Sequence, residues 1–164
     1  MAATCAATSC GYHAAGKADL VPKTVHTIAI PSFANTTTRY RLTGWLPEAI
    51  TREFISRTRY RIVPDPNEAD AVLNGAVTNF TSFPTVFDPA TGRASAVEVH
   101  VYMRVELVER ATGKMIFSRP AFEVRERYQI STDPTAFFEE SDAALERLAR
   151  QTARQVVSAV LENF

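Results

Sequence analysis

The strongest constraint on the fold is an unbroken alternation of apolar and polar residues over positions 97–107. The apolar positions are Val97, Val99, Val101, Met103, Val105 and Leu107. Glu98, His100, Tyr102, Arg104 and Glu106 lie between them. Successive side chains of a strand point to opposite faces, so this pattern predicts a long strand with one dry face and one wet face. Such strands are typical of antiparallel sheets.

Further strands are predicted on both sides of this segment. Residues 115–128 form a return strand after a turn at 111–114, bent near Arg119-Pro120 because proline cannot donate to a central ladder. Residues 69–83 form another β-like run, connected through turn residues 88–93, and Gly75 within it indicates a bulge or a close backbone approach. Two shorter strands are predicted at 25–30 and 59–63.

Two helices complete the expected fold. The first carries Leu46, Ala49, Ile50 and Phe54 at helical spacing, with Gly44 and Pro47 in its first turn. The second starts at Asp133-Pro134 and carries one apolar stripe. That stripe contains Leu145, Leu148, Ala149, Thr152, Val156 and Ala159 or Val160. The valine-rich sheet face is the apolar surface available to it, so we predict an α+β fold with two helices packed on one face of a mostly antiparallel four- to five-stranded sheet.

The 164 residues suit one folded domain, and we divide the chain into a signal remnant and lipidated tether at 1–24 and a single α+β domain at 25–164. Lys and Arg together number 18, as do Asp and Glu, which argues against a strongly basic nucleic-acid binder. The neutral total conceals a basic first third, where eight basic residues between Lys17 and Arg61 accompany three acidic ones. This region either meets an anionic partner or forms a solvated face of mixed charge.

Both cysteines, Cys5 and Cys10, lie at the start of the chain. The small residues Ala7, Thr8 and Ser9 before Cys10 are similar to the end of a bacterial lipoprotein signal, in which the cysteine carries acyl chains. Such signals usually have a leucine-like residue three positions before the cysteine, where this chain has Ala7. The positively charged start and the apolar run of a signal peptide are also missing. We predict lipidation at Cys10; the alternative is a chain terminus with two incidental thiols.

The sequence lacks the common motifs of catalysis. His13, His26 and His100 are isolated, no metal-ligand spacing appears, and no phosphate-binding glycine loop or nucleophile elbow is present. We therefore expect no enzyme, no metal and no cofactor.

Arginines at alternate positions are the candidate contact residues. If the strand at 59–63 extends back to residue 57, alternation places Arg57, Arg59 and Arg61 on one side of it. Arg39 and Arg41 repeat this spacing around Tyr40. Rows of arginine suit phosphate or carboxylate groups, and they also protect edge strands against unwanted pairing.

The chain resembles the LptE family of lipopolysaccharide-assembly lipoproteins. The resemblance lies in the order and spacing of several short segments in about the first seventy residues. These are Cys10-Gly11-Tyr12-His13, Leu20-Val21-Pro22, Ile28-Ala29-Ile30-Pro31, Arg59-Tyr60-Arg61-Ile62-Val63 and Ala69-Asp70-Ala71.

The resemblance implies a non-enzymatic protein anchored through Cys10 to the inner leaflet of the outer membrane and facing the periplasm. Its partners would be lipopolysaccharide and the outer-membrane β-barrel that inserts it, which the protein would plug and support. No family motif singles out ligand contacts, so the five arginines rest on charge alone. The alternatives are another periplasmic lipoprotein adaptor (a cell-wall synthase activator or a secretion accessory), an enzyme of unknown type, and a lipid carrier with an enclosed apolar cavity.

Overall fold

The computed structural model describes residues 21–129 and 134–162, with side chains of the last segment described from residue 142. Three short and three long strands form one sheet. The short strands are β1 (Thr27–Ala29), β2 (Ala34–Asn35) and β3 (Arg61–Val63), and the long strands are β4 (Ala71–Phe87), β5 (Ala94–Glu109) and β6 (Met115–Gln129). The strand order is β3-β1-β4-β5-β6, with β2 also paired to β4. The predicted α+β class is confirmed, although the sheet has six strands because of the two-residue β2.

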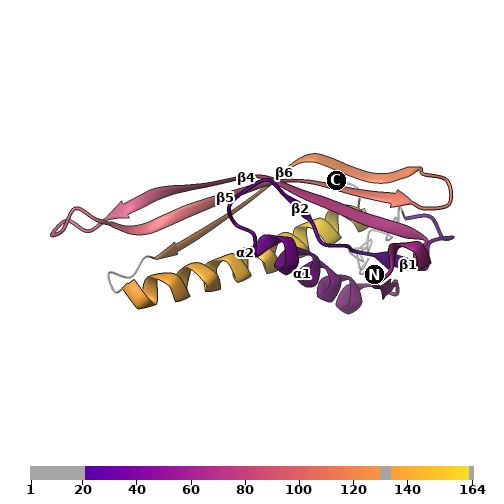
Figure 1. Ribbon diagram of the computed structural model, residues 1–164, viewed down its shortest axis with the longest axis horizontal. Coiled ribbons are helices and arrows are strands. Elements are labelled where there is room, and N and C mark those ends of the chain that lie inside the picture. The colour runs from indigo at the N-terminus through magenta and orange to yellow at the C-terminus, as the bar shows by residue number, and fades with distance from the viewer. Residues whose placement is uncertain (1–20, 130–133, 163–164) are drawn as a thin grey trace, which may run out of the picture.

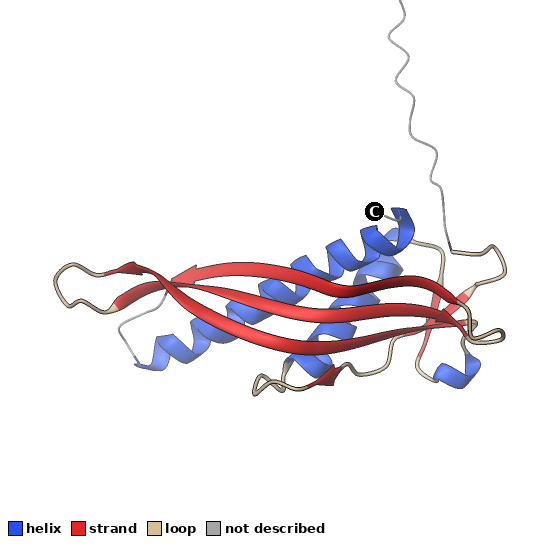
Figure 2. Cartoon of the chain, turned by 90° about the horizontal axis from the view of Figure 1, so that it is seen from above, coloured by secondary structure: helices blue, strands red, loops and turns tan. Residues whose placement is uncertain are grey.

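The long strands follow the alternation that the sequence predicts. They pair antiparallel and run side by side along the molecule, whereas β1, β2 and β3 pair in parallel (Figure 2). Val101, Val105 and Leu107 on β5 are fully buried, and the intervening polar residues lie on the outer face. In β6 the pairing shifts register between Phe122 and Arg119, which places the predicted bend beside Pro120.

Helices α1 (Leu42–Arg57) and α2 (Pro134–Glu162) cover one face of the sheet (Figure 1). Their apolar stripes meet the buried face of the long strands in one core. Both predicted stripes are confirmed: Leu46, Ile50 and Phe54 of α1 are fully buried, as are Leu148 and Val156 of α2. The predicted coverage by two helices on one side is therefore the observed arrangement.

Pro47 lies in the second turn of α1, not in the first as predicted, because the helix already begins at Leu42. Proline lacks the N–H that would bond the carbonyl four residues earlier, which belongs to Thr43. The N–H of Phe33 donates to that carbonyl at 3.2 Å, so the segment before the helix supplies the missing bond. The proline is thereby tolerated inside the helix.

Gly75 of β4 marks a close approach, one of the two roles predicted for it. A Cβ at this position would lie 2.2 Å from the Phe33 ring, which is itself buried at 2% exposure. The ring fills the space that a side chain would need, so β4 requires glycine here.

We predict that Gly75→Ala lowers the free energy of unfolding by about 1–3 kcal/mol, because the methyl group overpacks a filled core. Denaturant unfolding measures this loss. Gly44→Ala is the matched control: no atom lies within 4 Å of its added methyl, so helix propensity leads us to expect a gain of about 0.5 kcal/mol. Equal losses for the two variants would contradict the close-contact explanation.

Asp70 holds the start of β1. Its Oδ2 accepts hydrogen bonds from the backbone N–H of His26 at 2.8 Å and of Thr27 at 2.9 Å. The backbone N–H of Asp70 donates to Thr27 Oγ1 at 2.8 Å in return. The bond from His26, followed by that from Thr27, lowers the pKa of Asp70 below its ordinary 3.8.

We predict that Asp70→Asn lowers stability by about 1 kcal/mol at pH 7, a figure reduced for the partial exposure of the site. Because folding lowers the pKa of Asp70, its contribution is complete above the ordinary value and is lost as pH falls through the folded-state value. The difference between wild type and variant should therefore shrink below about pH 4. Urea unfolding at several pH values measures it, with Glu68→Gln as the neighbouring control; a constant difference would exclude the linkage.

Candidate functional site

The five candidate arginines form two groups at opposite ends of α1. Arg39 and Arg41 precede the helix, and Arg57 ends it, followed by Arg59 and Arg61. A helix of 16 residues is about 24 Å long. The arginines therefore form two separate surfaces.

Arg57 corrects the prediction of a single arginine row along an extended strand. The helix continues through Arg57, the Thr58 N–H and hydroxyl both donate to the carbonyl of Phe54, and β3 starts only at Arg61. These terminal bonds favour a helical end over a longer strand. The alternation of residues 57–61 is thus a coincidence of spacing.

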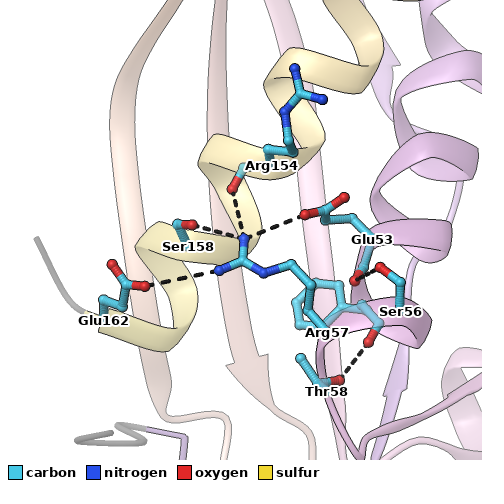
Figure 3. Close-up of polar contacts among 8 residues, drawn as sticks. Glu53, Ser56, Arg57, Thr58, Arg154, Ser158 and Glu162 are labelled. Carbon is cyan, nitrogen blue, oxygen red and sulfur yellow. Dashed lines mark hydrogen bonds and ion pairs between the residues drawn. The ribbon is translucent and has the colours of Figure 1, made fainter. Parts of the chain in front are cut away.

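The guanidinium of Arg57 joins the C-terminal ends of the two helices (Figure 3). Its Nη1 donates to Ser158 Oγ at 2.8 Å and lies 3.4 Å from Glu53 Oε1, and its Nη2 lies 3.9 Å from Glu162 Oε1. Nη1 also donates to the backbone carbonyl oxygen of Arg154 at 3.5 Å, so four partners on two helices occupy this side chain. Arg57 accordingly serves the packing of α1 on α2.

Arg59 and Arg61 differ from Arg57 because both are exposed and their guanidinium groups have no polar partner among the described residues. Tyr60 between them packs against the core. Arg61 lies in β3, which is the terminal strand of the sheet. These two guanidinium groups are available to an anionic ligand.

The segment before α1 places two arginines on aromatic rings. Arg39 Cζ lies 5.0 Å from the centre of the Phe80 ring, and Arg41 Cζ lies 5.6 Å from that of Trp45. Arg41 also pairs with Asp142 of α2. Hydrogen bonding to Tyr40 and the charge of Asp142 raise the pKa of Arg41 above its ordinary value. Arg39 has no carboxylate partner in the described part of the chain, so of these two it is the cation left for a ligand.

The end of the β4–β5 hairpin carries apolar residues that the sequence analysis did not select. Phe83, Val86 and Phe87 are 50%, 40% and 59% exposed, and the hairpin extends beyond the rest of the sheet (Figure 1). Nearby Arg93 and Arg127 are exposed, and their guanidinium groups lack a polar partner among the described residues. The uncharged run from Asn79 to Phe87 was the sequence signal for this surface.

Two further expectations concern chemistry and membrane attachment. Within residues 21–129 and 134–162, no three His, Cys, Asp or Glu side chains are grouped so as to hold a metal ion. None of the described helices is long and apolar enough to cross a bilayer. Cys10, the predicted lipidation site, lies outside the described residues.

Several solved structures share this fold at low sequence identity. Rare lipoprotein B from Shewanella oneidensis is 15% identical with a TM-score of 0.54, over 81% of this chain and 92% of that one. Lipoprotein B from Nitrosomonas europaea is 12% identical with a TM-score of 0.59, over 92% and 90%. A minor lipoprotein from Acinetobacter baumannii is 12% identical with a TM-score of 0.55, over 87% and 95%.

The search of curated proteins found no match to this chain. The model of the LptE family, described as lipopolysaccharide-assembly, matches residues 25–160. This range contains all six strands and both α-helices except the last two residues of α2. The sequence resemblance and this match agree. The chain therefore belongs to the LptE family of lipopolysaccharide-assembly lipoproteins.

Proposed function

We propose that this protein is a non-enzymatic outer-membrane lipoprotein that plugs and supports the β-barrel which inserts lipopolysaccharide, and that it helps to deliver lipopolysaccharide to the cell surface. Membership of the lipopolysaccharide-assembly family supports the assembly role. The plug role and the delivery step depend on the surfaces described above.

The observation that carries the plug role is the polar outer face of the three long strands. Glu98, Tyr102 and Arg104 on β5 and Glu123 and Arg125 on β6 share this face, whereas both helices cover the opposite one. The interior of a wide outer-membrane barrel is polar and wet. A sheet that keeps one broad face hydrated can occupy such a lumen without exposing its core.

Lipopolysaccharide carries phosphate groups, and arginine binds phosphate through paired hydrogen bonds. Of the five candidate arginines, Arg39, Arg59 and Arg61 have no carboxylate partner in the described structure. We assign the phosphate contacts to these three. Arg41 and Arg57 support the same surfaces by joining α1 to α2 through Asp142 and Ser158.

The proposed anchor is an acylated Cys10 in the periplasmic leaflet of the outer membrane. A single acyl chain binds a membrane only marginally, so several chains, or one chain together with the docked barrel, are needed for stable attachment. The protein would then face the periplasm with its domain in the barrel.

The first test is purification of a C-terminally tagged chain from its native membranes in mild detergent. We expect a large outer-membrane barrel protein to co-purify and intact-mass spectrometry to find an acylated Cys10. Cys10→Ser should lose the acyl mass, with Cys5→Ser as the matched control that keeps it. A soluble protein with a bare Cys10 thiol and no barrel partner would contradict the proposal.

The second test reverses the free charges. We predict that Arg59→Glu together with Arg61→Glu weakens binding of purified lipopolysaccharide by about tenfold, because charge-assisted bonds to phosphate become repulsive. The control pair, Arg52→Glu with Arg150→Glu, makes the same change in net charge at exposed positions of α1 and α2. It should leave the affinity for lipopolysaccharide within about twofold of wild type. Equal weakening by both pairs would show that net charge alone matters.

A further inference from the structure

Strand β6 is a terminal strand of the sheet and has one open edge. Strand β5 pairs with one side of it, and no strand among residues 21–129 and 134–162 pairs with the other side. Figure 2 shows the three long strands side by side, and β6 is an outer one of them. The free backbone N–H and C=O groups of such an edge form a template for a further strand. An edge of 15 residues therefore needs either protection or a partner.

Most of the open edges of this sheet are protected. The terminal strand β3 has only three residues. The hairpin half of β4 is also open in the described structure, but its pairing with β5 shifts register three times and Pro84 lacks an N–H. The first half of β6 contains Pro120 within a register shift. From Phe122 to Gln129, however, β6 pairs with β5 residue by residue, without a shift or a proline.

The charges on this unprotected segment have both signs. Glu123 and Arg125 are exposed on the outer face, two residues apart, and Arg125 Nε donates to Glu123 Oε1 at 2.9 Å. A row of like charges repels a second copy of the same edge, because like charges directly opposite each other destabilise a strand pair. A row of alternating sign is matched when a second copy runs antiparallel to it in the correct register.

A two-fold axis through Val124, perpendicular to the sheet, gives that register. It places Glu123 of each copy opposite Arg125 of the other, which forms two cross-strand ion pairs. Arg127 of each copy then lies opposite Ala121. An axis through Arg125 would set two arginines opposite each other, and an axis through Glu123 would set two glutamates opposite each other. Charge therefore selects the register that is centred on Val124.

The same axis keeps the helices of both copies on one side of the joined sheet. On the inner face, the buried Val124 meets its own copy, and Phe122 of each copy lies opposite Glu126 of the other. The carboxylate of Glu126 accepts a hydrogen bond from Arg147 Nε of α2 at 3.1 Å. The charge opposite the Phe122 ring is therefore already paired within its own chain.

We propose that residues 122–129 of β6 pair antiparallel with the same segment of a second copy of this chain, so that two sheets join into one. The occupant is a second copy because the segment is complementary in charge to itself in one register. This pairing requires neither a barrel nor lipopolysaccharide, so its test is separate from that of the proposed function.

Sedimentation of the purified full chain measures the pairing. Cys5→Ser and Cys10→Ser are introduced so that neither disulfides nor acyl chains cause association. We expect a monomer–dimer equilibrium between about 1 and 300 µM. Hydrogen exchange at alternate backbone amides of residues 122–129 should slow as the concentration rises, because every second N–H points away from β5. A monomer throughout this range, or a dimer whose β6 amides exchange at an unchanged rate, would overturn the proposal.

Charge reversal tests the register. Glu123→Arg and Arg125→Glu each set like charges opposite one another at two places, so we expect each variant to weaken the dimer by about tenfold. An equimolar mixture of the two variants should restore the wild-type affinity, because each copy then supplies the charge that the other lacks. Mixing could not restore a dimer that was lost through misfolding.

The matched control lies on the central strand β5. Arg104 and Glu106 have the same spacing, and Arg104 Nε lies 3.6 Å from Glu106 Oε1, but β4 and β6 flank this strand on both sides. Arg104→Glu and Glu106→Arg should each leave the dimer affinity within about twofold of wild type. Equal weakening by the β5 and β6 variants, or a mixture that stays monomeric, would exclude pairing along the β6 edge.

Discussion

The buried face of the three long strands is the constraint on which the rest of the structure depends. Strand β5 has 16 residues and therefore spans about 54 Å. A continuous row of valine, methionine and leucine side chains along it must be kept from water. Helix α2, with 29 residues, spans about 44 Å and supplies most of the cover, while α1 fills the space beside it. The strands are longer than their cover, and the exposed Phe83, Val86 and Phe87 lie at the end of the hairpin where they extend furthest.

The same burial explains which elements could be predicted from sequence. Residues 97–107 have a period of two over eleven positions, and the stripes of α1 and α2 have helical spacing over several turns, so burial leaves one solution for each. Short elements lack this redundancy. The two-residue β2 and the end of α1 are determined by individual hydrogen bonds, such as those from Thr36 to Val77 and from Thr58 to Phe54. A local pattern cannot reveal such bonds.

The candidate site shows the same division. Spacing selected arginine-rich segments, but it could not show which guanidinium groups have partners. Arg41 and Arg57 are paired with residues of α2 that lie 101 positions away in the chain, so their engagement becomes visible only in the folded molecule. Conversely, the sequence suggests that His100 is an isolated surface residue. Its contact with Glu123 comes from a neighbouring strand, 23 positions away, so a local pattern does not show it. Charge is a property of sequence, but availability for a ligand is a property of the fold.

The bond between Phe33 and Thr43 has a mechanical meaning. It fastens the first half of α1 to the segment that leads from β1, while Arg57 fastens the last turn to α2. A rod secured at both ends cannot slide or rotate without breaking one attachment. The helical layer and the sheet beneath it should therefore respond to an encounter as one stiff body, and the compliance needed to fit a partner of fixed shape is left to the overhanging ribbon of β4 and β5.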